Sequence, residues 1–315
     1  MGNNNPSISV IMPCYNAARY IGEAIQCVLD QTYSNTEIIV IDDGSSDTSP
    51  DIVSALRKRY PGRISLHQQN RLGPYPARNL GLRHASGDLI SFLDADDWWS
   101  TDCLEKLLHM LLEKGADLSY CGWQNVGENA PDQKPYIPPA YEKGDLVASF
   151  LKGCPWPIHA ALIRRDVIDA VGGFSERRFA SMDYDIWLRI LAHTRNIVCV
   201  PEVLAFYRWH GSGQISSTKW RQVLDAVQVR RDFVSSHPEL VKHLSPEALN
   251  DLVDGQLIKE AYRVYWKRDL SNAQKLFRAA LASRAWHTRD LKYLLPAMLP
   301  SRIFQGLVGL TDKTR

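Results

Sequence analysis

The first half of the chain alternates apolar segments typical of β-strands with segments whose apolar residues recur at helical spacing. The strand-like segments are residues 8–12, 38–42 and 89–93, and the helix-like segments are residues 21–29, 52–59 and 104–112. Such alternation predicts βαβ units, in which parallel strands form a sheet that helices cover on both faces. We therefore expect an α/β protein with a mostly parallel sheet.

Polar segments directly follow the three predicted strands. They are residues 13–16, 42–45 and 94–97. In an open α/β sheet, the loops at the carboxyl ends of parallel strands converge on one crevice, and ligands bind there. The functional site of this chain is therefore expected where these three segments meet.

Three carboxylates, Asp94, Asp96 and Asp97, come directly after the apolar residues 89–93. A carboxylate at the end of a buried strand is costly unless it is paired or faces a ligand. Asp94 and Asp96 can converge on Mg²⁺ or Mn²⁺, which take oxygen ligands and need few of them from the protein. The alternative is an acidic helix start, in which Asp97 and Asp102 interact with the helix dipole.

Residues near the other strand ends can bind a nucleotide. Asp43 can accept hydrogen bonds from a ribose or a base edge, and Gly44 permits the tight turn beside it. Asn70 and Arg78 add an amide and a guanidinium, and Arg78 can neutralise a phosphate. The alternatives are a turn with a helix cap after Asp43, and a solvated helix position for Arg78.

The middle and the end of the chain depart from the alternating pattern. Residues 122–145 are rich in Pro, Gly and Asn without clear periodicity, which predicts a long loop or lid. From Trp220 onward the chain is mainly helical, and residues 261–281 are typical of one helical hairpin of the tetratricopeptide kind. We therefore expect an α/β domain at residues 1–215 and an α-helical extension at residues 216–315.

Basic charge is concentrated in residues 284–315. Six Lys or Arg against two Asp give this segment a charge of +4, in a chain whose total is +2. Apolar and aromatic residues are interleaved with the basic ones, a pattern typical of a segment at an anionic membrane surface. The alternative is an amphipathic helix packed on the protein itself or on the second subunit of a homodimer.

Composition excludes some classes of protein. The chain has 37 basic and 35 acidic residues, so no overall charge draws it to nucleic acid, which is not an expected partner. Its six cysteines form no C-x-x-C pair, which predicts reduced thiols and a cytoplasmic location. No apolar run reaches the roughly 18 residues that a membrane crossing requires, so any membrane attachment is expected to be peripheral, on the cytoplasmic face.

Taken in order, the motifs resemble those of the family-2 glycosyltransferases. The likeness covers about residues 7–212 and is specific because six separate segments match. They are SVIMPCYN (9–16), IDDGS (41–45), ARNLG (77–81), FLDADD (92–97), GGF (172–174) and DYDIWLR (183–189).

The resemblance implies the GT-A fold, a Rossmann-like mixed sheet flanked by helices. It also implies an enzyme that moves a sugar, with inversion, from a nucleotide-diphosphate sugar to a glycan or lipid-linked glycan acceptor of the cell surface. UDP is the commonest donor nucleotide in the family. Asp96 would bind Mn²⁺ or Mg²⁺, which stabilises charge on the departing diphosphate. The matched nucleoside-binding positions are Pro13, Tyr15, Asp43, Asn70 and Arg78, with Asp94 at the ribose.

The resemblance also implies a general base. Asp183 matches the family's base position, from which a carboxylate accepts the proton of the acceptor hydroxyl. Family members commonly have Glu before this Asp, whereas this chain has Met182. The alternative for Asp183 is a carboxylate at the start of a helix.

Three further residues follow from the same likeness. Arg208 and His210 lie in the segment that closes the family's catalytic domain, where they would reach the diphosphate and its metal. Trp156 would stack on a sugar ring, with a place in the hydrophobic core as the alternative.

Other readings of these motifs remain open. A processive polymer synthase is not expected, because Ala205 stands where the Q-x-x-R-W motif requires Gln. A sugar nucleotidylyltransferase would need a glycine-rich basic loop after the first strand, and residues 13–16 offer none. A non-catalytic protein that only binds a sugar nucleotide is the third possibility, which Met182 keeps open.

Overall fold

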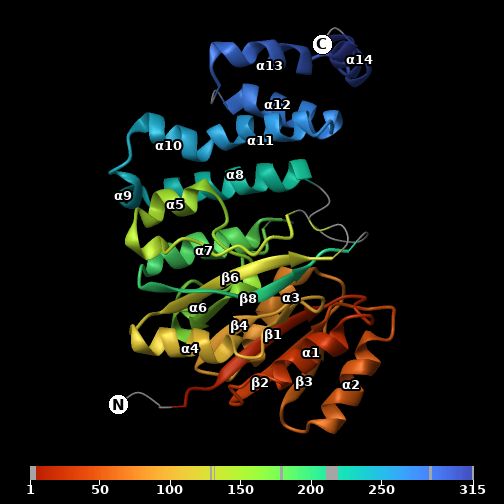
Figure 1. Ribbon diagram of the computed structural model, residues 1–315, viewed down its shortest axis with the longest axis vertical. Coiled ribbons are helices and arrows are strands. Elements are labelled where there is room, and N and C mark those ends of the chain that lie inside the picture. Colours follow the sequence, from red (N-terminus) through yellow and green to blue (C-terminus); the bar gives the residue numbers. More distant parts are fainter. Residues whose placement is uncertain are drawn as a thin grey trace. The chain divides into compact units, whose positions relative to one another are not determined.

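The computed structural model describes residues 5–127, 130, 132–177, 180–210, 219–283 and 286–313 (Figure 1). The chain divides into two compact units. The first unit comprises Met1–Leu146, Cys154–Arg177 and Ile186–Gly213, and the second comprises Val147–Gly153, Arg178–Asp185 and Gln214–Arg315.

The strands of the described residues form one eight-stranded sheet in the first unit, in the order β3-β2-β1-β4-β7-β6-β8-β5. Strands β1, β2, β3 and β4 pair in parallel, as do β6 and β8, whereas β7 and β5 pair antiparallel with their neighbours. The predicted mixed, mostly parallel sheet is thus confirmed. The strands are β1 (Ile8–Cys14), β2 (Thr36–Asp42), β3 (Ile64–Gln68), β4 (Leu89–Phe92), β5 (Trp98–Trp99), β6 (Leu118–Val126), β7 (Ala161–Arg164) and β8 (Ile197–Arg208).

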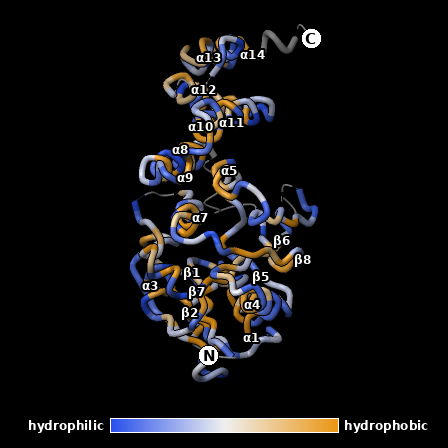
Figure 2. Tube along the Cα trace, turned by 90° about the vertical axis from the view of Figure 1, so that its left-hand side faces the viewer, coloured by the Kyte–Doolittle hydropathy of each residue, from blue (hydrophilic) through white to orange (hydrophobic). Residues whose placement is uncertain are grey.

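Helices flank this sheet because each has one apolar face. Helix α1 buries Ile21, Ala24, Ile25 and Val28, which lie three or four residues apart along the chain. All seven residues of β1 are buried, as expected for a central strand covered on both faces. Figure 2 shows hydrophobic residues gathered on the strands and on parts of the helices. The helices of this unit are α1 (Ile21–Leu29), α2 (Ser49–Arg59), α3 (Pro74–His84), α4 (Cys103–Glu113), α6 (Arg165–Ala170) and the part of α7 (Met182–His193) from Ile186 onward, whereas α5 (Leu146–Lys152) belongs to the second unit from Val147 onward.

The prediction of a loop over residues 122–145 is wrong at its start. Residues 122–126 continue β6 and pair with β8, after an irregularity at Gly122. A Cβ atom at Gly122 would lie 2.7 Å from the carbonyl oxygen of Tyr136, so glycine is needed there. The Gln and Asn side chains at this strand end do not favour a strand by propensity, and pairing with β8 makes it one, so the sequence alone did not predict it.

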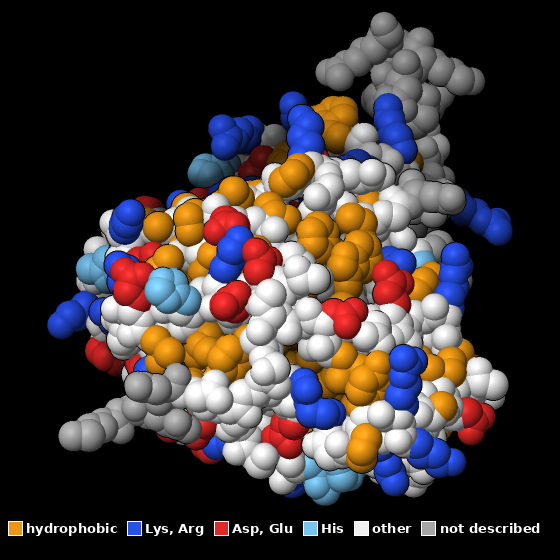
Figure 3. All heavy atoms as spheres, turned by 60° about the horizontal axis from the view of Figure 1, so that its bottom comes forward, with side chains coloured by type: hydrophobic (Ala, Val, Ile, Leu, Met, Phe, Trp, Pro, Cys, Tyr) orange, Lys and Arg blue, Asp and Glu red, His pale blue; other side chains and the backbone are white. Residues whose placement is uncertain are grey.

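On the face drawn in Figure 3, acidic and basic side chains are interspersed, in keeping with the small net charge.

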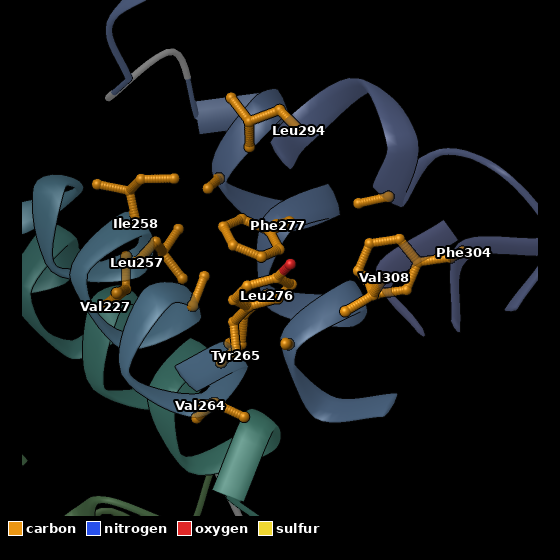
Figure 4. Close-up of a cluster of buried hydrophobic side chains, with 14 residues drawn as sticks. Val227, Leu257, Ile258, Val264, Tyr265, Leu276, Phe277, Leu294, Phe304 and Val308 are labelled. Atoms are coloured by element: carbon orange, nitrogen blue, oxygen red, sulfur yellow. The ribbon is translucent and has the colours of Figure 1, made fainter. Parts of the chain in front are cut away.

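The second unit is mainly helical. Its core gathers Val227 of α8, Leu257 of α11, Phe277 of α12, Leu294 of α13 and Phe304 of α14 (Figure 4). The predicted hairpin corresponds to α11 and α12. In the described part of the chain, no helix has the length and hydrophobicity needed to cross a membrane. The helices are α8 (Lys219–Ser236), α9 (Pro238–Val241), α10 (Pro246–Val253), α11 (Gly255–Trp266), α12 (Leu270–Ser283), α13 (Leu291–Ala297) and α14 (Ser301–Lys313).

Candidate active site

The three polar segments predicted to converge do emerge at one edge of the sheet. Strands β2, β1 and β4 are parallel neighbours, and their paired residues include Cys14 with Asp42 and Ile11 with Phe92. Each strand therefore ends at the same edge, where the loops after them lie side by side. The edge belongs wholly to the first unit.

Asp96 and His210 come together at this edge. Asp96 lies two residues before β5, which pairs with β8 so that Trp98 is opposite Phe206. His210 lies just beyond β8, and its Nε2 is 2.8 Å from the Asp96 Oδ2. Burial raises the pKa of the Asp96 carboxyl, and the charge of Asp94 raises it further. An oxygen and a nitrogen donor therefore meet in a position that favours a nearby positive charge.

This pair fits part of a metal site. Carboxylate oxygen and imidazole nitrogen are donors that Mn²⁺ accepts, and Mg²⁺ accepts the former. Within the described residues, no group of three or more His, Cys, Asp or Glu side chains is arranged to hold a metal ion. Asp96 and His210 would therefore supply two ligands, and the others would have to come from a bound ligand or water.

Asp97 supports the turn from behind. Its side chain is 1% exposed, and its Oδ1 accepts a hydrogen bond of 2.8 Å from the backbone N–H of Arg208. Its Oδ2 lies 3.2 Å from Nδ1 of the buried His159, although the two atoms are not aligned for a hydrogen bond. Burial raises the pKa of Asp97 well above its usual range and lowers that of His159 to about 4. Asp97 thus joins the Asp96 turn to the end of β8, where His210 follows.

Sequence reasoning did not select Asp97 or His159 as site residues. Asp97 carried a signal, a third carboxylate directly after a buried strand. His159 carried none, because an isolated histidine is usually structural.

Arg208 also holds the Asp96 turn. Its Nε donates to the backbone oxygen of Asp96 at 2.8 Å, and its Nη2 pairs with Glu23 at 2.8 Å. The guanidinium lies 4.3 Å from the ring centroid of Trp98 and 4.8 Å from that of Tyr20. Arg208 therefore joins β8 to both the acidic turn and α1, and its contact with a diphosphate stays a prediction.

Arg78 and Asp94 form a partly buried ion pair. Arg78 of α3 is 3% exposed, and its Nη2 is 2.5 Å from the Asp94 Oδ1. The alternative of a solvated helix position for Arg78 is therefore wrong. Since the pair is charge-assisted, each side chain fixes the orientation of the other. Their contacts with a nucleotide stay predictions.

Asp43 accepts three hydrogen bonds from the loop after β3. Its Oδ1 accepts from the N–H of Leu72 at 2.7 Å and from the Gln69 side chain at 2.8 Å, and its Oδ2 accepts from the N–H of Gly73 at 2.8 Å. A carboxylate has about four acceptor positions, so these three bonds fill most of them. Asp43 therefore stabilises this loop, whether or not it also contacts a ligand.

The remaining predicted nucleoside residues lie around this loop. Tyr15 is 39% exposed, and the guanidinium of Arg71 lies 4.5 Å from its ring centroid. Asn70 is exposed, whereas Pro13 is buried in β1. An aromatic ring and a cation are thus available at the surface of this edge.

Two of the matched motifs contact each other. Asn79 of the ARNLG segment donates to the backbone oxygen of Phe174 at 2.9 Å and accepts from its N–H at 2.8 Å. Gly173 has a φ of +68°, and a Cβ there would lie 2.8 Å from the Asn79 Oδ1. The second glycine of GGF is therefore required by its conformation and by this contact.

Trp156 is a core residue, so its predicted stacking on a sugar is wrong for this structure. The side chain is 1% exposed, and its ring stacks on Tyr120 with centroids 4.1 Å apart. Trp187 packs at 5.5 Å and donates to the Trp156 backbone oxygen. With neither ring face open, Trp156 has no surface to offer a sugar.

Asp183 lies in the first turn of α7 and is half-buried. It follows Met182, which is 1% exposed, so the position of the family's Glu holds a buried apolar side chain. Asp183 belongs to the second unit, whereas Asp96 belongs to the first. Its role as the base stays a prediction.

Comparison with known proteins identifies the family. The model of glycosyl transferase family 2 matches residues 9–172. TuaG of Bacillus subtilis, a glycosyltransferase whose name assigns it to teichuronic acid biosynthesis, is 30% identical over 239 residues, which cover 75% of this chain and 92% of TuaG. WfgD of Escherichia coli, named as a UDP-Glc:alpha-D-GlcNAc-diphosphoundecaprenol beta-1,3-glucosyltransferase, is 32% identical over 231 residues, which cover 73% of this chain and 87% of WfgD. The chain belongs to glycosyl transferase family 2 and is a glycosyltransferase, which removes the nucleotidylyltransferase alternative.

Solved structures share the fold. Residues 1–349 of S. aureus TarS, in complex with UDP-GlcNAc, match with a TM-score of 0.66 at 18% identity, over 98% of this chain and 92% of that one. The mannosyltransferase PcManGT of Pyrobaculum calidifontis, in complex with GDP-Man and Mn²⁺, matches with a TM-score of 0.59 at 20% identity, over 99% of this chain and 89% of that one. The predicted GT-A fold is thus confirmed.

Proposed function

We propose that this enzyme transfers one sugar, with inversion, from a nucleotide-diphosphate sugar to a hydroxyl of a glycan or lipid-linked glycan in cell-surface polysaccharide synthesis. The observation that carries the proposal is the contact between Asp96 and His210, 2.8 Å apart at the edge where β1, β2 and β4 end. The names of TuaG and WfgD support this acceptor class. WfgD and the TarS complex support UDP as the donor nucleotide, while the GDP-Man complex of PcManGT leaves GDP as the rival.

We propose that Asp96 and His210 hold Mn²⁺ or Mg²⁺ against the diphosphate. When bound, the ion would supply Lewis-acid stabilisation of the negative charge on the departing nucleoside diphosphate. Asp96 would contribute a carboxylate oxygen and His210 would contribute Nε2, while Asp97 and Arg208 hold the turn that presents them. The Mn²⁺ in the PcManGT complex supports this assignment.

The donor would lie along the strand ends. We propose that Tyr15, Asp43 and Asn70 contact the nucleoside beside the buried Pro13. Asp94 would bind the ribose, oriented by Arg78. Arg208 would add positive charge beside the diphosphate, because its guanidinium already lies against the Asp96 turn.

We propose Asp183 as the general base. The acceptor oxygen would form its bond to the anomeric carbon as the bond from that carbon to the diphosphate oxygen breaks. The acceptor proton passes to the Asp183 carboxylate, and the electron pair of the broken bond leaves with the nucleoside diphosphate. The half-buried position at the start of α7 supports this role, because the carboxylate stays partly exposed to solvent.

We also propose how the two parts of the chain share the work. Residues 1–215 would form the catalytic domain, and residues 216–315 would bring the enzyme to a membrane that carries the acceptor, on its cytoplasmic face. A homodimer formed through the same helices is the alternative.

Two experiments test the proposal. Thermal melting with UDP-, GDP- and dTDP-sugars, with and without Mn²⁺, should raise the melting temperature for one donor and more so with the ion. No shift with any donor would contradict the donor site. Asp183→Asn should lower transfer by about 10²- to 10⁴-fold while keeping the donor-induced shift. Asp169→Asn, at an exposed carboxylate of α6, is the control that should keep both; normal turnover by Asp183→Asn would remove it as the base.

A further inference from the structure

We infer that α13 and α14 form a docking surface for an anionic lipid membrane. Five apolar side chains on and between these helices are exposed, three or four residues apart for the most part. They are Leu295 (58%), Met298 (55%), Leu299 (37%), Ile303 (52%) and Leu307 (41%). We call them the docking residues.

The same helices also bury apolar side chains. Leu294 and Ala297 of α13, with Phe304 and Val308 of α14, are buried in the core of the second unit (Figure 4). An amphipathic helix of a soluble domain needs only this one apolar face, with polar residues on the other. The docking residues are therefore additional apolar surface, which packing within the unit does not require.

Charge identifies the partner. Among the described residues 286–308, the exposed charged side chains are Arg289, Lys292 and Arg302, all basic. The single acidic side chain of that range, Asp290, is 5% exposed and accepts hydrogen bonds from the Tyr262 hydroxyl and the His287 N–H. Each Lys or Arg near an anionic membrane surface strengthens binding to it.

The same charges disfavour a second copy of this chain. A two-fold interface brings the same surface together from both subunits, so the basic residues of one copy would face those of the other. Like charges across an interface are destabilising, whereas anionic headgroups would neutralise them. A segment with exposed apolar side chains, whose exposed charges among the described residues 286–308 are all basic, thus matches a lipid interface better than a homodimer.

The surface is held in place before any ligand binds. The corner between α13 and α14 is tied to α12, where Gln274 donates to the backbone oxygens of Ala297 at 3.0 Å and Leu299 at 2.7 Å. Arg278 donates to the same two oxygens at 2.7 and 2.8 Å. Docking would therefore not have to pay for folding of the corner, which raises affinity for the same contacts.

The inference rests on the proposed function in one respect. Membrane binding would serve the enzyme because it would bring the enzyme to its proposed lipid-linked acceptor. Binding itself is testable without substrate. The full chain is mixed with phosphatidylcholine vesicles, with or without phosphatidylglycerol, and the bound fraction is measured by sedimentation. We expect binding to the anionic vesicles, which weakens as salt is added because the charges are screened.

Variants separate the two contributions. Leu295→Glu with Ile303→Glu should weaken binding to anionic vesicles by at least about tenfold, because two apolar side chains become charged. Arg289→Gln, Lys292→Gln and Arg302→Gln together should weaken it by a similar factor and reduce its salt dependence. Leu112→Glu, at a 44% exposed position of α4 in the first unit, is the matched control that should bind as the unaltered chain does.

Three outcomes would overturn the inference. They are an unaltered chain that stays in the supernatant with anionic vesicles, a Leu295→Glu, Ile303→Glu variant that binds as tightly, and a lipid-free dimer in sedimentation velocity that this variant dissociates. The last would assign the surface to a second copy. A retained melting transition and donor-induced shift in the variant show that folding and the donor site are intact, so failure here is distinct from failure of the proposed function.

Discussion

Two acidic turns at neighbouring strand ends differ in how their carboxylates are satisfied. After β2, Asp43 accepts two backbone N–H groups and one side-chain amide. After β4, Asp96 contacts the imidazole of His210 and lies beside the buried Asp97, and burial raises the pKa of both carboxyls. Aspartates at similar positions after two neighbouring strands therefore have different hydrogen-bond partners.

The difference teaches which carboxylates are structural and which are poised for a cation. Neutral backbone N–H groups fill acceptor positions of the Asp43 carboxylate, so the β2 turn is stable without a cation. Carboxylates that crowd one another away from water favour protonation or a bound cation. The β4 turn is accordingly where we propose that a divalent ion binds.

The largest expected effect separates the turns by activity. Asp96→Asn should lower transfer by about a thousandfold, which corresponds to about 4 kcal/mol of lost leaving-group stabilisation, and should remove the Mn²⁺ dependence of donor binding. Asp43→Asn keeps an acceptor oxygen, so donor binding should weaken while its Mn²⁺ dependence persists. Steady-state rates and titration calorimetry with Mn²⁺ distinguish the two variants. Equal metal dependence in both would contradict the proposed difference between the two turns.

The next effect concerns the histidine behind the β4 turn. Burial lowers the pKa of His159 from 6.5 to about 4, so the unfolded chain takes up this proton at a higher pH than the folded chain does. The stability that neutral His159 contributes is complete above about pH 6.5 and is lost as the pH falls toward 4, by about 3 kcal/mol.

Denaturant unfolding at several pH values measures this loss. His159→Gln has no such proton, so its free energy of unfolding should fall less over the same range. His109→Gln, at an exposed histidine, is the control that should keep the slope of the unaltered chain. Parallel pH profiles for His159→Gln and the unaltered chain would show that His159 is protonated equally easily in both states.

The smallest effect compares the turns by stability. Asp97→Ala should destabilise the fold by about 2 kcal/mol, because the N–H of Arg208 loses its acceptor at a partly buried position. Asp43→Ala should cost only about 1 kcal/mol, because the loop N–H groups of Leu72 and Gly73 can turn to water. Thermal melting would measure both. A larger loss in Asp43→Ala would reverse the comparison.

Local patterns made much of the fold predictable. The strands β1, β2 and β4 and the helices α1, α2 and α4 end within three residues of the predicted segments. Their apolar periodicity involves only neighbouring residues, so it can be recognised from the sequence alone. Strands β5 and β7, of two and four residues, are too short to show a period, and β6 ends in polar residues whose pairing with β8 makes them a strand.

For the site, sequence motifs selected Asp96 and His210, but their contact spans 114 positions in the chain and depends on the pairing of β5 with β8. Trp156 shows the opposite case, because a Trp suited to a sugar was placed in the core by Tyr120 and Trp187.

By itself, then, the sequence determined the strand and helix pattern of the first half, the carboxylates at the strand ends and the family to which the chain belongs. Tertiary structure decided which of those carboxylates find backbone donors and which are left beside one another and a histidine. The physical reason is the separation of the interacting residues along the chain. Periodicity is a property of neighbouring residues, whereas hydrogen-bond partners and burial come from segments far apart in the chain, which only the folded sheet brings together.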